Sequence, residues 1–358
     1  MSDRRVALIV GVTGITGQNA ARALLDEGWT VFGLSRRAGT VLPGVHHLYA
    51  DTLDPNSLRM ALHGLDISHL IFATWSRQPT EAENCEVNGA MLRNTLEVLV
   101  STTQLDHVSL VTGLKHYLGP FESYAQSPME TPFRENQARN PYPNFYYVQE
   151  DILFAAAEVF GFTWSVHRAS TIIGWALGNL MNMGVTLALY GSLCRETGAP
   201  FVFPGSPEGW NGIVDIVDAR LLGRHLQWSL TEPTCRNEAF NVTNGDVFRW
   251  RQMWPILAAD LGVEPAPYPG EANPLAERMG DADDAWARIV TENELAPTKA
   301  SDLASWWHTD ADLGRNLEAF ADMSKSRRAG FLEFKTSADS FLELFEQMRT
   351  ERIIPRHR

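Results

Sequence analysis

Apolar and polar positions change their spacing in a regular order along the first half of the chain. Short apolar runs such as RVALIVGV and ISHLIFAT are typical of buried strands, whereas ITGQNAARALLDEGW and residues 84–102 have the spacing of amphipathic helices. Further strands are predicted at TVFGLSRR, VHHLYAD, HVSLVTG and TWSVHRAS, and further helices at 55–63 and 147–161. This β-α-β alternation predicts a parallel sheet with helices on both faces, and right-handed crossovers make it doubly wound.

The alternation stops after residue 173. Residues 174–212 are rich in glycine and apolar residues, 213–245 return to a strand and helix pattern, and the chain from about 263 to 335 is rich in Pro and Trp and mostly helical. We therefore expect an α/β protein with a Rossmann-type sheet in residues 1–173, to which 213–245 return. A smaller, mostly helical substrate-binding region is expected at 174–212 and 246–358.

Composition and charge narrow the function classes. With 358 residues, 44% of them hydrophobic and 20% charged, the chain resembles a soluble enzyme in composition. The net charge of -13 makes nucleic acid a poor partner. No apolar run reaches about 18 residues, so no membrane span is expected, and the charged first residues do not resemble a signal peptide.

The spacing of the Cys and His residues indicates whether to expect disulfides or a metal site, and whether the protein resides in a reducing compartment. The three Cys are widely spaced and odd in number, which argues against disulfides and zinc and favours a reducing compartment. The ten His show no HxxxH or HxH pattern, so no metal site is expected. We expect a cytoplasmic protein that acts on a small molecule, with neither nucleic acid nor membrane as a partner, and a homodimer is left open.

A glycine motif follows the first predicted strand. GVTGITG places Gly11, Gly14 and Gly17 where that strand passes into the first helix. Glycines at this spacing permit a tight turn and close approach of the backbone to a pyrophosphate, which the helix N-terminus attracts with free N–H groups. The alternative is a tight turn without a ligand. The context favours a dinucleotide site that includes Thr13 and Ile15.

The second strand ends at Ser35, Arg36 and Arg37. An enzyme that uses NAD usually has an acidic residue there for the ribose 2′-hydroxyl, whereas guanidinium groups suit a 2′-phosphate. We therefore predict NADPH as the cofactor; the alternative is a surface Arg pair. Asp51 ends the third strand, where it would contact the adenine or serve as a turn or helix-capping residue.

The stretch NFYYVQED at 144–151 carries a candidate catalytic Tyr without the usual Lys. In many dehydrogenases a Lys four residues after the Tyr shares its helix face and tunes the phenol, but here Tyr146 is followed at that distance by Glu150. Lys115, in the loop after the fifth strand, could reach the site from another direction. Taken alone, Lys115 would be read as a solvated loop residue.

The motifs TGLKHYLGPFE and NFYYVQED, together with GVTGITG, SRR, Thr74-Trp75, NCEVN at 84–88 and NEAFNVTNGDVFRW at 237–250, carry a resemblance over residues 6–355. The chain resembles the progesterone 5β-reductase/iridoid synthase group of atypical short-chain dehydrogenases. That resemblance implies Lys115 and Tyr146 as the catalytic pair. The expected cofactor contacts, beyond those above, are Thr74, Trp75, Thr112, Gly113, Tyr146 and Ile173. The expected walls of the substrate pocket are Trp75, Phe121 and Phe341, of which the two Phe could equally be core aromatics.

The resemblance implies NADPH-dependent reduction of an activated C=C bond in an enone or enal. Tyr146 would stabilise the enolate oxygen and Lys115 would lower the pKa of that Tyr. Two enzymatic alternatives use the same fold: a carbonyl reductase, and a sugar-nucleotide epimerase or dehydratase that depends on NAD(P). The non-enzymatic alternative is an NADPH-binding sensor or scaffold.

Overall fold

A computed structural model describes residues 5–37, 39, 41–120, 130–176 and 178–356. The chain forms two compact units. Unit 1 comprises Met1–Ser170, Arg220–Val242 and Ala321–Glu333, and unit 2 comprises Thr171–Ala219, Thr243–Phe320 and Phe334–Arg358. The sequence pattern had suggested 213–245 as the segment returning to the sheet. The observed return is shorter, because the strand at Ile216–Asp218 pairs within unit 2, and a second returning segment ends at Glu333.

Unit 1 contains a seven-stranded sheet in the order β3-β2-β1-β4-β5-β6-β9, and every neighbouring pair is parallel. This arrangement confirms the predicted doubly wound sheet, whose order reverses beside β1. Its strands are β1 (Val6–Val10), β2 (Thr30–Ser35), β3 (Val45–Tyr49), β4 (His69–Phe72), β5 (His107–Gly113), β6 (Thr163–Ala169) and β9 (Glu238–Val242).

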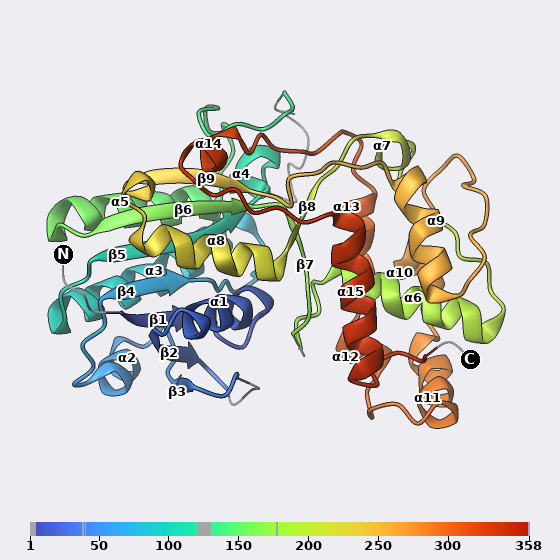
Figure 1. Ribbon diagram of the computed structural model, residues 1–358, viewed down its shortest axis with the longest axis horizontal. Coiled ribbons are helices and arrows are strands. Elements are labelled where there is room, and N and C mark those ends of the chain that lie inside the picture. The colour runs from blue at the N-terminus through green and yellow to red at the C-terminus, as the bar shows by residue number, and fades with distance from the viewer. Residues whose placement is uncertain (1–4, 38, 40, 121–129, 177, 357–358) are drawn as a thin grey trace. The chain divides into compact units, whose positions relative to one another are not determined.

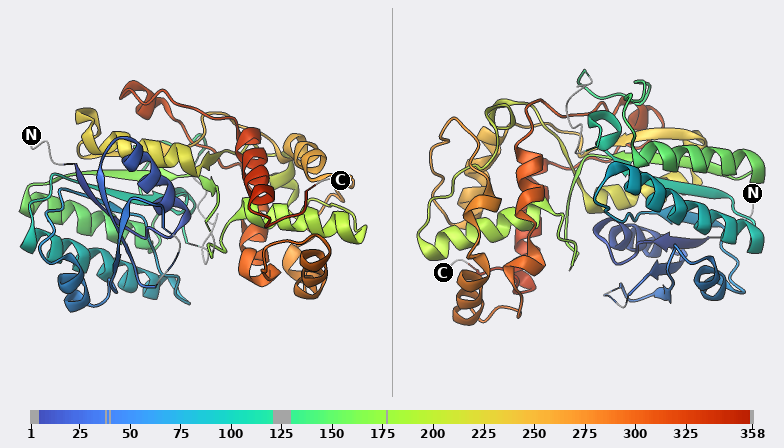
Figure 2. Two further views of the ribbon diagram at one scale, coloured as in Figure 1. Left: turned by 60° about the horizontal axis from the view of Figure 1, so that its bottom comes forward. Right: turned by 180° about the vertical axis from the view of Figure 1, so that it is seen from behind.

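Helices cover both faces of this sheet. Figure 1 shows α1 and α8 on one face, and the view from behind in Figure 2 shows α3 and α5 on the other. Even-numbered strand residues such as Leu8 and Val10 share a core with α2, α3 and α5. The helices of unit 1 are α1 (Ile15–Asp26), α2 (Pro55–Leu62), α3 (Glu81–Thr102), α4 (Lys115–Leu118), α5 (Phe145–Phe160), α8 (Ala219–Thr231) and α14 (Ser324–Arg328), with a 3-10 turn, η2 (Pro233–Cys235).

Local capping chemistry explains where two of these helices begin. Thr80 and Glu83 form a capping box at the start of α3, each side chain satisfying the other's backbone N–H. Asn144 caps α5, accepting a hydrogen bond from the N–H of Tyr146 at 3.0 Å. Since α3 begins at Glu81 and α5 at Phe145, both helices start earlier than the periodicity alone predicted.

A hydrogen-bonded chain of buried His and Ser side chains lies on the α8 face of the sheet. His107 Nε2 lies 2.9 Å from Ser165 Oγ, and Ser165 Oγ lies 2.8 Å from His167 Nε2. His167 Nδ1 then lies 3.0 Å from His225 Nδ1, and His225 Nε2 lies 3.2 Å from Ser326 Oγ. Burial lowers the pKa of His225 to about 3 and those of His107 and His167 well below their usual value. All three imidazoles are therefore neutral in the folded protein near neutral pH.

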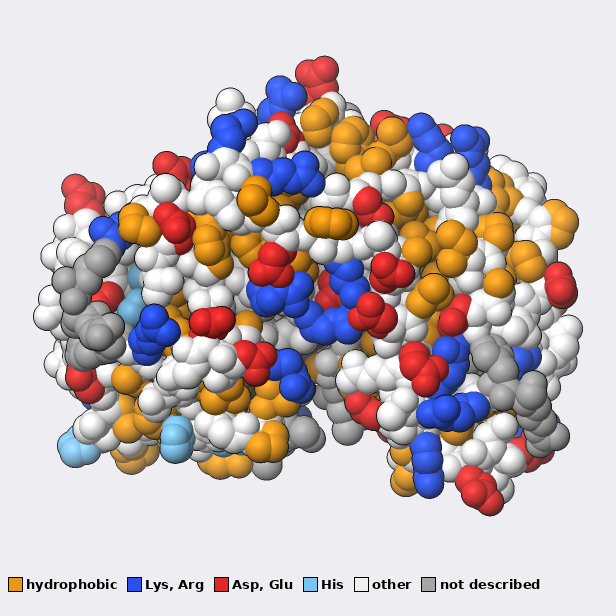
Figure 3. Space-filling view, viewed as in Figure 1, with side chains coloured by type: hydrophobic (Ala, Val, Ile, Leu, Met, Phe, Trp, Pro, Cys, Tyr) orange, Lys and Arg blue, Asp and Glu red, His pale blue; other side chains and the backbone are white. Residues whose placement is uncertain are grey.

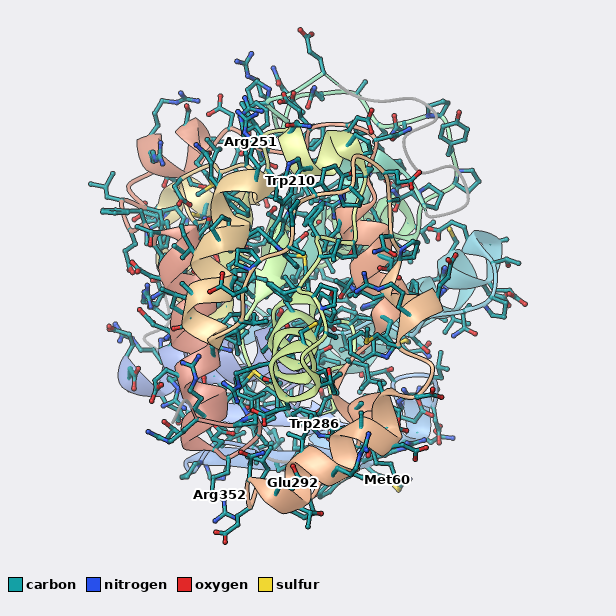
Figure 4. All side chains as sticks on the ribbon, turned by 90° about the vertical axis from the view of Figure 1, so that its right-hand side faces the viewer. Met60, Trp210, Arg251, Trp286, Glu292 and Arg352 are labelled. Carbon is teal, nitrogen blue, oxygen red and sulfur yellow. The ribbon has the colours of Figure 1, made fainter. Side chains whose placement is uncertain are left out.

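Unit 2 is mostly helical around one buried helix, α6. Twelve successive residues of α6, Met183 to Cys194, are buried, which is expected of a helix surrounded by others. Figure 4 looks along α6 and shows α11, which carries Trp286, packed beside it. Strands β7 (Thr171–Ile173) and β8 (Ile216–Asp218) form a small parallel sheet. The helices are α6 (Met183–Thr197), α7 (Pro207–Asn211), α9 (Trp250–Leu261), α10 (Leu275–Arg278), α11 (Ala282–Glu292), α12 (Ala300–Leu303), α13 (Trp306–Leu313) and α15 (Ser337–Thr350).

Charges of both signs lie on the surface, and the three Cys form no disulfide in the described part of the chain. Figure 3 shows acidic and basic side chains interspersed over the visible face. Among the residues that the structure describes, no helix is long and apolar enough to cross a membrane, and no cluster of three His, Cys, Asp or Glu side chains could hold a metal ion. Cys85, Cys194 and Cys235 are free thiols.

Candidate active site

The glycine loop connects β1 to α1 at the carboxyl edge of the sheet. Gly11 has a φ of 91°, a backbone conformation that favours glycine. A Cβ on Gly17 would lie 2.2 Å from the carbonyl oxygen of Gly11, so only glycine allows the first turn of α1 to pack on the loop. Gly14 caps α1 without a side-chain hydrogen bond, which leaves the helix N-terminus to other acceptors. The loop, with Thr13 and Ile15, thus fits a pyrophosphate.

The end of β2 adjoins this loop, since the N–H of Gly11 donates to the carbonyl oxygen of Leu34 at 2.9 Å, and β3 ends beside β2 at the same edge of the sheet. Arg36 and Arg37 are exposed directly after β2. Ser35 Oγ donates to the carbonyl oxygen of Arg37 at 2.7 Å and lies 2.8 Å from His47 Nε2, which fixes the course of the chain there. Asp51 accepts a hydrogen bond from the N–H of Leu53 at 2.9 Å, so its carboxylate stabilises the turn after β3. Its contact with the adenine stays a prediction.

Trp75, which follows β4, and Phe145, the first residue of α5, bring aromatic rings beside Lys115. The Trp75 and Phe145 rings stack with centroids 5.5 Å apart, and Lys115 Nζ lies 5.0 Å and 5.1 Å from the two centroids. Thr112 and Gly113 are buried at the end of β5. A Cβ on Gly113 would lie 3.4 Å from the Tyr146 hydroxyl oxygen, so this glycine lies directly against the phenol.

Lys115 and Tyr146 are connected through one side chain. Lys115 is the first residue of α4, and Tyr146 is the second residue of α5. Asn144 Nδ2 donates to the carbonyl oxygen of Lys115 at 2.6 Å, while Asn144 Oδ1 accepts from the N–H of Tyr146 at 3.0 Å. The same residue therefore fixes the backbone of both proposed catalytic groups. Sequence reasoning had placed Lys115 on a loop; it opens a short helix instead.

Burial dominates the electrostatics of the phenol. It raises the pKa of Tyr146 well above its ordinary value, and the carboxylate of Glu81 raises that pKa further. Glu81 is 4% exposed and accepts hydrogen bonds from the N–H of Phe145 at 2.8 Å and from Asn84 Nδ2 at 3.0 Å. The lowering of the pKa expected from Lys115 is thus outweighed. Tyr146 is a neutral hydrogen-bond donor over the whole physiological pH range.

Sequence reasoning gave no role to Glu81, Asn84 and Asn88. Asn84 Oδ1 accepts from the N–H of Gln78 at 2.8 Å, and Asn88 Oδ1 accepts from the N–H of Ser76 at 2.7 Å. These contacts fix the segment that follows Trp75. The sequence did contain a signal for their role, namely two Asn on the buried face of α3. Buried polar side chains need hydrogen-bond partners, so these amides could have been expected to bind nearby backbone.

Two of the remaining expected residues belong to unit 2, and the third is Phe121. Ile173 and Phe341 belong to unit 2, where both are fully buried in its hydrophobic core. Phe341 contacts the rings of Trp250 and Phe345 there, with centroids 5.9 Å and 6.3 Å away. Phe121 lies outside the described residues. The roles of these three residues toward cofactor or substrate stay predictions.

Comparison with known proteins identifies the family. Residues 57–355 match the PRISE-like Rossmann-fold domain. The chain belongs to the PRISE-like family. It is similar to the (S)-8-oxocitronellyl enol synthase of Nepeta cataria, at 40% identity over 98% of this chain and 93% of that protein. It is also similar to the 3-oxo-Δ4,5-steroid 5β-reductase of Arabidopsis thaliana, at 38% identity over 99% of this chain and 94% of that one.

Several solved structures are similar to this chain in fold, but their low sequence identity supports no further comparison. The UDP-glucose 4-epimerase of Thermotoga maritima matches with a TM-score of 0.69 at 15% identity, over 96% of this chain and 99% of that one. The PRISE-like membership confirms both the expected fold and the expected enzyme class, an oxidoreductase of the short-chain dehydrogenase/reductase superfamily.

Proposed function

We propose that this PRISE-like protein reduces the activated C=C bond of an enone or enal with NADPH. The observation that carries the proposal is the pairing of Lys115 and Tyr146 through Asn144 at the carboxyl end of β5. The plant steroid reductase, by its name, acts on a 3-oxo-Δ4,5 compound, in which a C=C bond is conjugated with a ketone. Nearly full-length identity of 38% to that protein supports the same chemistry here.

The chain's own residues would act on the carbonyl oxygen of the substrate. NADPH, when bound, supplies the hydride for the β-carbon. As negative charge then develops on the carbonyl oxygen, the Tyr146 hydroxyl donates a hydrogen bond to it. A preorganised donor of this kind stabilises the transition state by about 3–4 kcal/mol. The Lys115 ammonium adds positive charge beside that oxygen, and the α-carbon takes its proton from solvent.

The raised pKa of Tyr146 agrees with this role. A donor that remains protonated can stabilise an enolate without transferring its proton completely. The site is also partly desolvated, as the half-buried Tyr146 and Lys115 and the buried Phe145 show, so the hydrogen bond is stronger than it would be in water.

The cofactor site would combine the glycine loop with the ends of the parallel strands. Gly11, Gly14 and Gly17 would accommodate the pyrophosphate at the N-terminus of α1, and Arg36 and Arg37 would bind the 2′-phosphate. The proposed nearby contacts are Thr13, Ile15, Ser35, Asp51, Thr74, Trp75, Thr112 and Gly113. Ile173 is proposed as a further cofactor contact, and the rest of unit 2, with Phe341, as the substrate-binding region.

Replacing Arg36 and Arg37 together with Ala is expected to raise the KM for NADPH by about 10–100-fold, because charge-assisted hydrogen bonds to a phosphate are lost. The KM for NADH should change less than about threefold, since NADH has no 2′-phosphate. Steady-state kinetics with both cofactors measure the effect. The control replaces Arg22 and Arg59, exposed on α1 and α2, and so removes the same charge. Equal changes for the two cofactors would refute the 2′-phosphate role.

The proposed reaction is tested by following NADPH absorbance with a small panel of substrates. Turnover is expected with 2-cyclohexenone, progesterone or 8-oxogeranial, and product analysis should show loss of the C=C bond with the carbonyl retained. Turnover of saturated ketones alone would favour a carbonyl reductase. Absence of any net NADPH oxidation would favour an epimerase or a cofactor-binding scaffold. The lack of Lys four residues after Tyr146 argues against the epimerase.

A further inference from the structure

We infer that Glu150 is a positioning residue for Lys115: its buried carboxylate fixes His116 and thereby the short helix α4 that presents the Lys. The inference rests on the proposed function, in which Lys115 and Tyr146 form the catalytic pair. Glu150 occupies the position four residues after Tyr146 where other dehydrogenases carry their Lys.

Glu150 is a buried charge with several partners. It is 1% exposed, and its carboxylate lies 2.9 Å from Arg139 Nη2, 3.4 Å from Arg168 Nη2 and 3.3 Å from His116 Nδ1. Burial alone would oppose ionisation, but the polar contact with His116 and the charges of the two Arg outweigh it and lower the pKa of Glu150 to about 2. The carboxylate is therefore ionised near neutral pH.

His116 transmits the position of this carboxylate to the backbone beside Lys115. Its ring is 1% exposed and packs edge-on against Tyr117 and Tyr147, with centroids 4.9 Å and 5.0 Å away. Burial lowers the pKa of His116, so the imidazole is neutral, and its Nδ1 lies 3.3 Å from the Glu150 carboxylate as a polar contact without hydrogen-bond geometry. Since His116 immediately follows Lys115, fixing the imidazole also fixes where the Lys side chain leaves the backbone.

The conformation of α4 depends on such contacts because the helix is only four residues long. A single turn has little stability of its own. Three consecutive carbonyl oxygens accept side-chain hydrogen bonds from residues 140–147: that of Lys115 from Asn144 Nδ2 at 2.6 Å, that of His116 from Tyr147 Oη at 2.5 Å and that of Tyr117 from Asn140 Nδ2 at 2.7 Å. These three contacts hold the backbone of α4, whereas Glu150 contacts a side chain of that helix, His116.

The helix face explains why a carboxylate at this position does not oppose catalysis. Residues four apart share one side of a helix, so Glu150 lies one turn after Tyr146 on the side of α5 that faces α4, where it contacts His116. The carboxylate that raises the pKa of Tyr146 is Glu81, whereas the charge of Glu150 is compensated by Arg139 and Arg168. Glu150 can therefore act on the turn that carries the Lys.

The test compares Glu150→Gln with Asp151→Asn. Both changes remove one negative charge from a carboxylate that binds Arg139, but the Asp151 side chain is 63% exposed and pairs with Arg139 Nη1 at 2.7 Å. Three quantities are measured. The first is the hydrogen exchange of the amides of residues 117–119, which donate to the carbonyl oxygens of Leu114 and Lys115. The other two are kcat with an enone and the KM for NADPH.

In Glu150→Gln we expect these amides to exchange about tenfold faster and kcat to fall about tenfold, while the KM for NADPH changes less than about twofold, because a misplaced catalytic group slows the chemical step. Asp151→Asn should match the wild type in all three. Exchange and kcat equal to those of Asp151→Asn would overturn the inference. Faster exchange with unchanged kcat would overturn it too, because α4 would then be fixed without effect on the reaction.

If Glu150→Gln does not fold, Glu150→Asp takes its place. It keeps the negative charge beside Arg139 and Arg168 but shortens the side chain, so the contact with His116 Nδ1 lengthens. Faster exchange with a several-fold lower kcat is expected, and unchanged values would contradict the inference. A failure of the proposed function can be told apart from a failure of this inference. If the proposed function is wrong, none of the enones will support NADPH oxidation by the wild-type protein. The exchange experiment would still show whether Glu150 fixes α4.

Discussion

Replacing Tyr146 with Phe is expected to lower kcat for enone reduction by about 10²–10³-fold, the usual effect of removing one preorganised donor to a developing oxyanion. The ring itself remains, so its 4.3 Å packing against Phe145 and the helix cap at Asn144 should survive. The affinity for NADPH, measured by fluorescence titration, and the melting temperature should therefore change little.

The matched control is Tyr49→Phe, which removes a phenolic hydroxyl from a Tyr that is 56% exposed on β3. Its kcat should equal that of the wild type. A Tyr146→Phe variant within about threefold of wild-type kcat would mean that another group stabilises the enolate oxygen.

Acidification is expected to destabilise the protein through the buried chain of His107, His167 and His225. Each pKa is lowered by burial in the folded state, so the unfolded chain binds more protons, and the free energy of unfolding falls as pH falls below the ordinary His range. Between about pH 7.5 and about pH 5.5 each such His removes about 1.4 kcal/mol of stability. Three of them remove about 4 kcal/mol, a large part of the usual total of about 5–15 kcal/mol.

Urea unfolding followed by Trp fluorescence across this pH range measures the effect. His225→Gln retains an amide that can bond to Ser326 but cannot titrate, so the loss of stability over that interval should be smaller by about 1.4 kcal/mol than in the wild type. His63→Gln, at an exposed residue following α2, should leave the pH dependence unchanged. Identical pH dependence in His225→Gln and wild type would show that His225 does not carry this linkage.

Local patterns predicted the sheet well because each signal lies within a few residues. The apolar run at Val6–Val10 and the glycines that follow it required no information from distant parts of the chain. The start of α5 was also encoded locally, in Asn144, whose amide caps the helix one residue before Phe145. A cap is easily overlooked when apolar spacing alone sets the boundary.

The surroundings of the catalytic pair were less accessible to sequence reasoning, since they depend on long-range contacts. Glu81 bonds to the N–H of Phe145, 64 residues away, and Arg168 reaches Glu150 from β6. Nothing in the local sequence of NFYYVQED shows that Glu150 points to His116. Only the packing of α4 against α5 shows that the carboxylate which replaces the usual Lys lies on the side of the turn carrying Lys115.

The discontinuity of unit 1 has a consequence for synthesis on the ribosome. Residues 5–170 supply six of the seven strands, but β9, α8 and α14 come from segments that end at Val242 and Glu333. Until those segments emerge, the face with His107 and His167 lacks α8, and β6 is an open edge. We therefore expect the sheet of unit 1 to be completed only after most of the chain has been translated, so that unit 1 does not finish folding before the segments of unit 2 that precede Ala321 have emerged.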